Sequence, residues 1–220
     1  MDFKEIINKR RAVNHFDPMK DVPESLIKSI VETASRTPSG FNLQPWILIV
    51  LKNPEENAKL RKLAWNQEKV TQAPVVLIVL ADRDAWREEH PFVQRTIKEM
   101  VKAGTMEEGK HQWFIDAARN LYGENKEKQQ AFACKNTGFF AMSLMLAAKD
   151  MGLDTHPMDG FDHESVRKEF HIPENYWIPL LIAVGYFDKE KELSPPKWRK
   201  TYDEIIVNFH VKEDRSKEKG

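Results

Sequence analysis

Residues 131–148, AFACKNTGFFAMSLMLAA, decide the fold, because as a helix they are apolar on nearly every side apart from Lys135, Asn136 and a few small polar residues. A helix with apolar residues all round needs protein on all of its sides. The helix is predicted to extend over about 126–151, with Gly152 as a suitable residue just beyond its end. The sequence therefore predicts one long, central, buried helix.

Three continuous apolar runs indicate strands that are buried on both faces of a sheet. They are Trp46–Leu51, Val75–Leu80 and Pro179–Tyr186, with a shorter strand at 153–156. Helices are predicted around them, at 2–9, 23–36, 53–67 and 162–170, and as a less regular helical excursion at 84–122. This order indicates an α+β or α/β fold with a central sheet wrapped by helices.

Composition narrows the class of protein. The 220 residues are 41% hydrophobic and 31% charged, which fits one globular domain over residues 1–211 followed by a charged, flexible tail at 212–220. The formal net charge is zero, so the chain lacks the basic excess that a nucleic-acid binder needs. A single cysteine excludes an intramolecular disulfide. The N-terminus lacks the apolar run of a signal peptide, and we expect a cytoplasmic protein without a membrane partner.

One apolar, β-branched run, Ile205–Phe209, is separated from the rest of the chain by a polar linker. It has no obvious partner strand in its own sheet. We therefore expect an edge strand, added either to the sheet of a second subunit or to its own.

Several catalytic motifs are absent from the sequence. It contains no GxGxxG, no GxxxxGK[ST], no GxSxG and no HExxH. The seven histidines are scattered and read as ordinary surface or core residues, so no metal site is expected. Cys134 lies in the apolar helix, where packing is a better interpretation than nucleophilic catalysis.

Five polar or basic islands interrupt the apolar structure, at residues 9–14, 38–46, 65–69, 157–162 and 197–199. Each also has an ordinary interpretation, as a solvated helix end, a connection or a turn.

Their side chains nevertheless suit a polar ligand. The guanidinium groups of Arg10 and Arg11 match a phosphate. Asn66 and Lys69 are three residues apart and share a face if they are helical, so one amide and one ammonium group can meet the edge of a heterocycle.

The set of islands, in this order, resembles the FMN-dependent nitroreductase family over nearly the whole chain, from residue 2 to about 209. The matching pieces are KRRAVNHFD, TPSGFNLQPW, the Asn66/Lys69 pair, GLDTHPMDGFD, PLLIAVGY and KWRK. The resemblance implies an α+β fold with a mixed central sheet wrapped by helices. It also implies an intertwined homodimer with exchange of the C-terminal strand and with FMN at the interface.

The resemblance also implies which residues bind the cofactor. Arg10, Arg11, Lys197 and Arg199 should contact the phosphate or ribityl chain. Asn66 and Lys69 should face the pyrimidine edge, and Asp159 and Gly160 should lie beside N5 of the flavin. The partner subunit should supply Pro38, Ser39, Gly40 and Asn42. The remaining implied cofactor contacts are Ala12, Asn14, Gln44, Pro157 and Met158.

The candidates for the substrate pocket are the aromatic residues Phe41, Trp113, Phe114, Tyr122 and Phe132. For the last four as a group, core packing is the stronger interpretation. We name no catalytic side chain, because in this family the cofactor carries the chemistry.

Three positions depart from the family pattern. Ala12 stands where Ser or Thr is usual, and Asn14 where many members have Arg or Lys. Because Asn14 brings no cation to the flavin, we expect a somewhat lower reduction potential than in relatives with two cations. Phe41 replaces a small polar residue, which should narrow the pocket and favour flat aromatic substrates.

The implied activity is transfer of a hydride from NAD(P)H through flavin N5 to a small, flat, conjugated acceptor, a nitroaromatic or a quinone, in a ping-pong cycle. Three alternatives are a flavoenzyme of the same fold with a different substrate, of dehalogenase or dehydrogenase type, a non-catalytic flavin-binding protein, and a purely structural helical dimer.

Overall fold

Four strands form one sheet in the computed structural model, which describes residues 2–207. The strand order is β1-β2-β4-β3, and every neighbouring pair is antiparallel. The strands are β1 (Trp46–Leu51), β2 (Val75–Asp82), β3 (Asp154–Met158) and β4 (Tyr176–Gly185). All eight residues of β2 are buried, as its continuous apolar run predicted.

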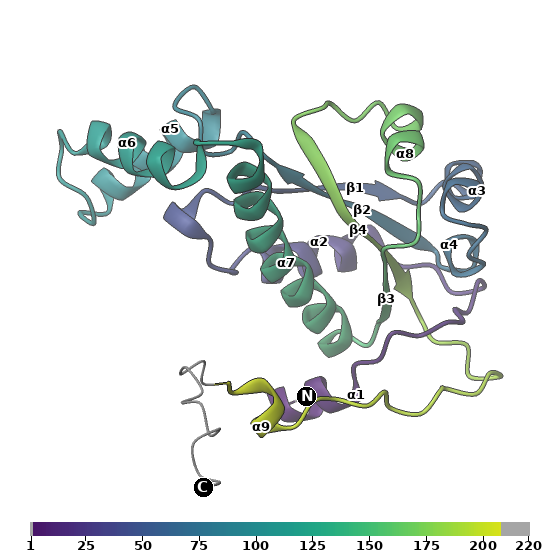
Figure 1. The fold of residues 1–220 in the computed structure, drawn as a ribbon. Coiled ribbons are helices and arrows are strands. Elements are labelled where there is room, and N and C mark those ends of the chain that lie inside the picture. Colours follow the sequence, from purple (N-terminus) through teal and green to yellow (C-terminus); the bar gives the residue numbers. More distant parts are fainter. Residues whose placement is uncertain (1, 208–220) are drawn as a thin grey trace, which may run out of the picture.

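The prediction of a mixed sheet was wrong for the described residues. The one parallel pairing they make is an isolated bridge between Ala12 and Thr155. Strands that are apolar on both faces are typical of parallel sheets. Such strands require only that helices cover both faces of the sheet, whatever the direction of the strands. Here helices cover both faces of an antiparallel sheet (Figure 1).

Ten helical segments surround the sheet in the described part of the chain. They are α1 (Phe3–Lys9), α2 (Glu24–Ala34), the 3-10 turn η1 (Gly40–Asn42), α3 (Pro54–Leu63), α4 (Lys69–Gln72), α5 (Pro91–Lys102), α6 (His111–Tyr122), α7 (Lys126–Asp150), α8 (His163–Glu169) and α9 (Tyr202–Ile205). Several begin at Asp or Asn residues whose side chains accept a hydrogen bond from a backbone N–H of the first turn, including Asp2, Asn53, Asn125 and Asp162.

Two apolar clusters hold the helices on the sheet. On one face, α2 and α7 pack against β2 and β4, and the Phe140 ring of α7 stacks on Trp46 of β1 at 4.9 Å. On the other face, α3, α4 and α8 cover the sheet through residues such as Leu60, Val70 and Val166.

The long helix α7 confirms the central element expected from residues 131–148. Within residues 2–207 it is the one helix long and apolar enough to cross a membrane, and somewhat more than half of its most apolar window is buried inside the fold. Its apolar residues are therefore explained mainly by the protein core. Part of one face, with Phe139 and Met142, is exposed in the single chain.

Helices α5 and α6 form the helical excursion expected at 84–122 and extend beyond the end of the sheet (Figure 1). A third apolar cluster joins them to α7, with Phe114 of α6 and Phe132 of α7 both buried.

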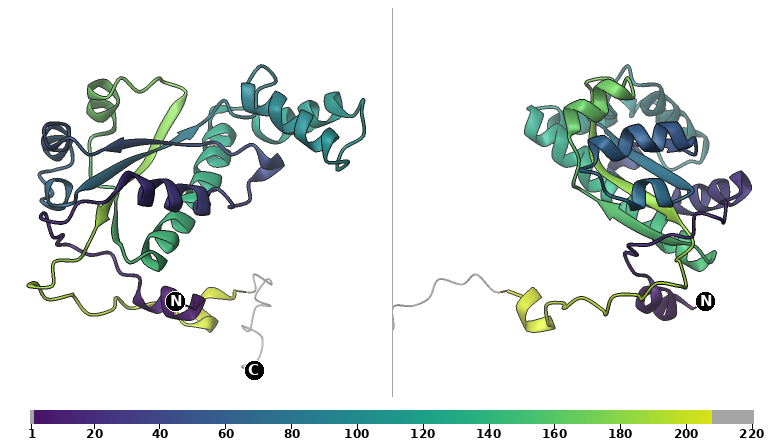
Figure 2. Two further views of the ribbon diagram at one scale, coloured as in Figure 1. Left: turned by 180° about the vertical axis from the view of Figure 1, so that it is seen from behind. Right: turned by 90° about the vertical axis from the view of Figure 1, so that its right-hand side faces the viewer.

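The chain leaves the sheet after β4 as an arm, residues 187–201, that runs past α1 to α9 (Figure 2). The prediction of a strand at Ile205–Phe209 was wrong at its start. Thr201 and Glu204 form a reciprocal capping box, so Ile205 ends a helix instead. The rest of that predicted run from residue 208, and the predicted tail at 212–220, lie outside the described residues.

We predict that Leu144→Ala lowers the free energy of unfolding by about 2–5 kcal/mol, because Leu144 is fully buried between α7 and the sheet. Denaturant unfolding at one fixed protein concentration measures the change. Lys98→Ala, at an exposed position of α5, should stay within about 0.5 kcal/mol of the wild type. Equal losses for the two variants would contradict the packing described here.

Candidate functional site

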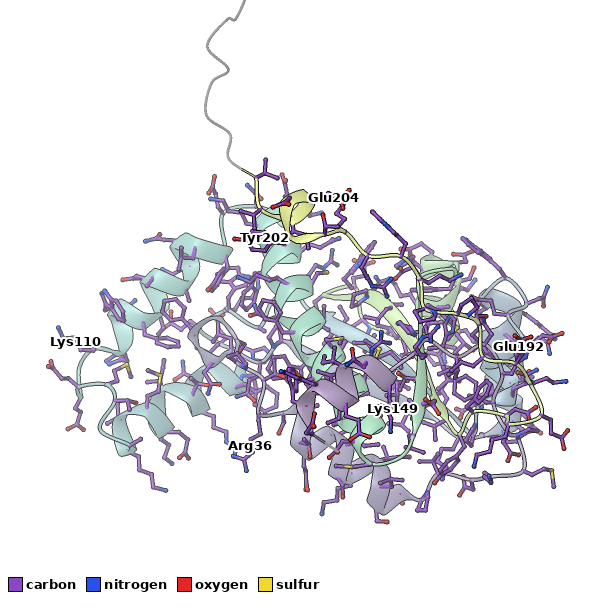
Figure 3. The ribbon with its side chains drawn as sticks, turned by 90° about the horizontal axis from the view of Figure 1, so that it is seen from below. Arg36, Lys110, Lys149, Glu192, Tyr202 and Glu204 are labelled. Carbon is purple, nitrogen blue, oxygen red and sulfur yellow. The ribbon has the colours of Figure 1, made fainter. Side chains whose placement is uncertain are left out.

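A cavity of about 660 Å³ lies between the segment that follows α1 and the arm that follows β4. Figure 3 looks onto this side, where the arm runs from Glu192 toward Tyr202 and Glu204 of α9. Its lining brings together six of the residues predicted to bind the cofactor: Arg10, Arg11, Ala12, Asn14, Lys197 and Arg199.

Backbone contacts explain why the two ends of the chain meet at this cavity. The N–H of Asp17 donates to the carbonyl of Tyr186, and the N–H of Asp188 donates to the carbonyl of His15. The arm therefore starts beside the basic segment that follows α1. The guanidinium group of Arg11 also donates to the carbonyl of Ser194 in the arm.

Cations crowd this cavity. Burial lowers the pKa of Arg10 below its usual value, and the nearby charges of Arg199 and Arg11 lower it further. Glu192 is the one carboxylate among the lining residues, against four Lys or Arg side chains. An anion bound here would relieve this repulsion, so the cavity is a candidate anion site.

The loops at 65–69 and 157–160 meet next to the cavity, but not in the way we expected. Trp65 and Asn66 have left-handed backbone angles, with φ of 50° and 57°, and lie in the turn between α3 and α4. Lys69 is the first residue of α4. The expectation that Asn66 and Lys69 share a helix face was therefore wrong, because two left-handed residues interrupt the helix.

Gln67 joins the two loops, and the sequence reasoning did not single it out. Its Nε2 donates to the carbonyl of Gly160 at 2.8 Å, and its Oε1 accepts from Nζ of Lys69 at 3.4 Å. A Cβ at position 160 would come within 2.9 Å of the Trp65 ring, so glycine is required there for close packing. Burial lowers the pKa of Lys69.

His156 of β3 links these loops to the cavity, which it also lines. Its Nδ1 donates to the carbonyl of Val13 at 2.8 Å. Sequence reasoning treated His156 as an ordinary histidine. The feature of the sequence that could have identified His156 is its position inside GLDTHPMDGFD, directly before Pro157.

The segment 38–44 is held against the N-terminal half of α7. The N–H of Gly40 donates to Oδ1 of Asn136 in α7 at 3.1 Å, and a Cβ at Gly40 would overlap the Tyr122 hydroxyl. Phe41, Asn42 and Gln44 all have positive φ, near 50°. Non-glycine residues rarely adopt this conformation, and such strain concentrates at functional segments.

The predicted pocket aromatics gather around Phe41. The Phe41 ring lies 5.0 Å from Phe114, 6.2 Å from Tyr122 and 6.4 Å from Trp113. Trp113 is exposed and Tyr122 is half-buried, whereas Phe114 and Phe132 are core residues that line no open surface. Asn42 and Gln44 line a separate cavity of about 400 Å³.

The sequence profile of the nitroreductase family matches residues 7–186. The chain belongs to the nitroreductase family. It is 35% identical to NADH dehydrogenase of Thermus thermophilus over 193 residues, which cover 84% of this chain and 87% of that protein. It is 30% identical to YdgI of Bacillus subtilis, assigned as an NAD(P)H nitroreductase, over 84% of this chain and 88% of YdgI.

A solved structure from Exiguobacterium sibiricum, assigned as a nitroreductase and determined in complex with FMN, has the same fold. Its TM-score is 0.82 at 25% identity, over 94% of this chain and 97% of that one. The predicted family and α+β fold are confirmed.

In this nitroreductase-family chain, the predicted cofactor residues fall into two separate groups. The first surrounds the basic cavity and continues through His156 to Lys69, whose charge acts on the His156 ring. The second, at 38–44, packs against the N-terminal half of α7 and joins the aromatic cluster. One chain does not bring the two groups together.

We predict that the exposed residue Arg199 contributes to an anion site. Inorganic phosphate at saturating concentration should raise the Tm of the wild-type protein, freed of any bound FMN, by about 2–4 °C above a sodium chloride control of equal ionic strength. Arg199→Glu should abolish this rise, because it replaces a cation of the cavity by an anion.

Lys200→Glu makes the same charge change on the neighbouring exposed residue, which does not line the cavity, and should keep the rise. Differential scanning calorimetry measures each Tm. A phosphate response that survives in Arg199→Glu would refute the anion site.

Proposed function

We propose that this nitroreductase-family oxidoreductase binds FMN in the basic cavity and passes a hydride from NAD(P)H to a small, flat, conjugated acceptor. Nitroaromatics and quinones are the proposed acceptors, and the two half-reactions form a ping-pong cycle. Membership of the family and the NAD(P)H-linked names of its relatives support this proposal. The meeting of Arg10, Arg11 and Arg199 in the lining of one cavity is the observation that carries the FMN assignment.

The residues of this chain fit FMN in charge and in chemistry. The phosphate is a dianion, and the cavity offers the four cationic groups of Arg10, Arg11, Lys197 and Arg199. The next groups along the site, Lys69 and Asn66, offer hydrogen-bond donors for the carbonyl oxygens of a flavin ring. Asp159 and Gly160 follow directly after β3, where backbone N–H groups are free of the ladder.

Bound FMN supplies the hydride chemistry at its N5 atom. The protein's part is to bind the phosphate, to orient the ring and to exclude bulk water from the reacting face. Lys69, whose pKa is lowered by burial, brings the hydrogen-bond donors of its amino group to the pyrimidine edge. No acid or base in the chain is assigned a proton-transfer step.

We further propose a homodimer in which each cofactor site uses both chains. Exposed apolar residues on α1, on α7, on the arm and in or just after α9 support it, including Phe3, Phe139, Trp198, Tyr202 and Ile206. Such a set exposed together is typical of an interface. The partner's segment 38–44 would then complete the site, with Phe41, Trp113 and Tyr122 bounding the substrate pocket.

Exchange of the C-terminal segment is part of this dimer proposal. Among the described residues, β1 pairs on one side only, and Ile47 and Val50 are partly exposed. A strand edge of this kind accepts an added strand. The segment that follows Ile206 is the proposed addition, from the second copy. We also place the protein in the cytoplasm, with no nucleic-acid or membrane partner.

We predict that the purified protein is yellow and that anaerobic NADH or NADPH bleaches its flavin absorbance. A nitroaromatic or a quinone should then restore the colour, and steady-state rates at varied donor and acceptor should give parallel double-reciprocal lines. Absorbance spectroscopy measures both half-reactions.

Each negative result of this absorbance experiment leads to a different conclusion about the protein. Protein that stays colourless after reconstitution with FMN would refute the flavin site. Yellow protein that neither nucleotide bleaches would indicate a non-catalytic flavin binder. Bleached protein that none of these acceptors reoxidises would indicate an enzyme of the same fold with another substrate.

A further inference from the structure

Two hydrogen bonds, one with the backbone of Thr155 and one with the His156 ring, hold the basic segment of the cavity in place. The N–H of Val13 donates to the carbonyl of Thr155 at 3.2 Å, and Nδ1 of His156 donates to the carbonyl of Val13 at 2.8 Å. A carbonyl oxygen only accepts, so Nδ1 carries a hydrogen. In the neutral ring, Nε2 is then left with its lone pair.

The surroundings of His156 disfavour protonation of the ring. Burial lowers its pKa below the usual value, the charge of Lys69 lowers it further, and the hydrogen bond to Val13 opposes both. The charged and titratable groups that line the cavity together with His156, or that act on its ring, are mostly cationic. They are Arg10, Arg11, His15 and Glu192 from the cavity lining, Lys69 from α4, and Lys197 and Arg199 from the arm. This excess of positive charge disfavours a second proton on the ring.

The unprotonated Nε2 of a neutral imidazole ring accepts a hydrogen bond and therefore needs a hydrogen-bond donor. This requirement indicates which part of the ligand His156 contacts. This assignment for His156 rests on the proposed FMN site. Arg10 and Arg199 occupy the phosphate end, and Lys69 is assigned to the ring edge. His156 lines the same cavity as Arg10 and Arg199, and the charge of Lys69 acts on its ring. The part of FMN that joins the phosphate to the ring is the ribityl chain. Its hydroxyl groups donate hydrogen bonds, whereas an ionised phosphate has no proton to donate.

We propose that Nε2 of His156 accepts a hydrogen bond from a ribityl hydroxyl of the flavin, so that flavin affinity falls when His156 is protonated. His156 is thus a cofactor-positioning residue on two counts. Nδ1 holds the segment that carries Arg10 and Arg11, and Nε2 accepts a hydrogen bond from the ribityl chain. Protonation removes the acceptor and adds one more cation to a cavity that already has four.

Riboflavin binding tests the proposal, because riboflavin keeps the ribityl chain and lacks the phosphate, whose own ionisation would add a pH dependence. Riboflavin is titrated into the full-length protein freed of FMN, between pH 8 and pH 5, with quenching of flavin fluorescence as the readout. The Kd of the wild type should be constant above the His156 pKa and should rise about fivefold toward pH 5.

Two variants at this position separate the roles. His156→Ala should bind riboflavin about fivefold more weakly at pH 8, with no further loss toward pH 5. His156→Gln can donate to Val13 through its amide and accept through its oxygen, so it should keep wild-type affinity at pH 8 and lose the pH dependence. Far-UV circular dichroism of each variant checks that it is folded.

His15→Gln is the matched control, because His15 is the other histidine that lines the cavity. It should keep the wild-type pH profile. A pH profile that disappears in His15→Gln, or that persists in His156→Gln, would overturn the proposal. So would a wild-type Kd that is flat between pH 8 and pH 5 while FMN binds. A wild type that binds neither FMN nor riboflavin would instead refute the proposed function.

Discussion

The candidate site depends on the crowding of guanidinium groups around one cavity. Arg10 lies partly buried beside Arg11, and Arg199 reaches the same cavity from near the other end of the chain. Like charges at close range destabilise one another unless an anion lies between them. The backbone is nevertheless arranged to hold them there, through the pairing of residues 15–17 with 186–188 and of Val13 with Thr155. The fold thus bears an electrostatic cost that a bound phosphate would offset.

Much of this arrangement was predictable from the sequence. The continuous apolar runs predicted three strands, and residues 131–148 predicted the central helix, because burial on all sides leaves a plain pattern in sequence. Local backbone geometry was not predictable. The left-handed residues Trp65 and Asn66 interrupt a run that reads as helix, and Thr201 with Glu204 converts a β-branched run into the end of a helix. The role of His156 depends on Val13, 143 residues away, and no local pattern shows such a contact.

The separation of the predicted site residues has a physical interpretation. Segment 38–44 is strained, yet Asn136 in the N-terminal half of α7 and the aromatic cluster hold it in place. The same helix leaves Phe139 and Met142 exposed, with Met142 lining the basic cavity. A second copy packed on this face would cover the apolar surface and would bring its own segment 38–44 toward the cavity. A site shared by two chains accounts for both observations.

Hybrid dimers test this shared site most directly. One chain carries Arg10→Glu and the other Asn42→Glu, with different affinity tags so that the mixed dimer is purified after co-expression. Neither homodimer should retain FMN, because both sites of each carry a defect. The mixed dimer should retain one FMN per dimer, because its two defects fall on the same site and leave the other intact. A mixed dimer without FMN, or Asn42→Glu homodimers that bind FMN as the wild type does, would contradict the account.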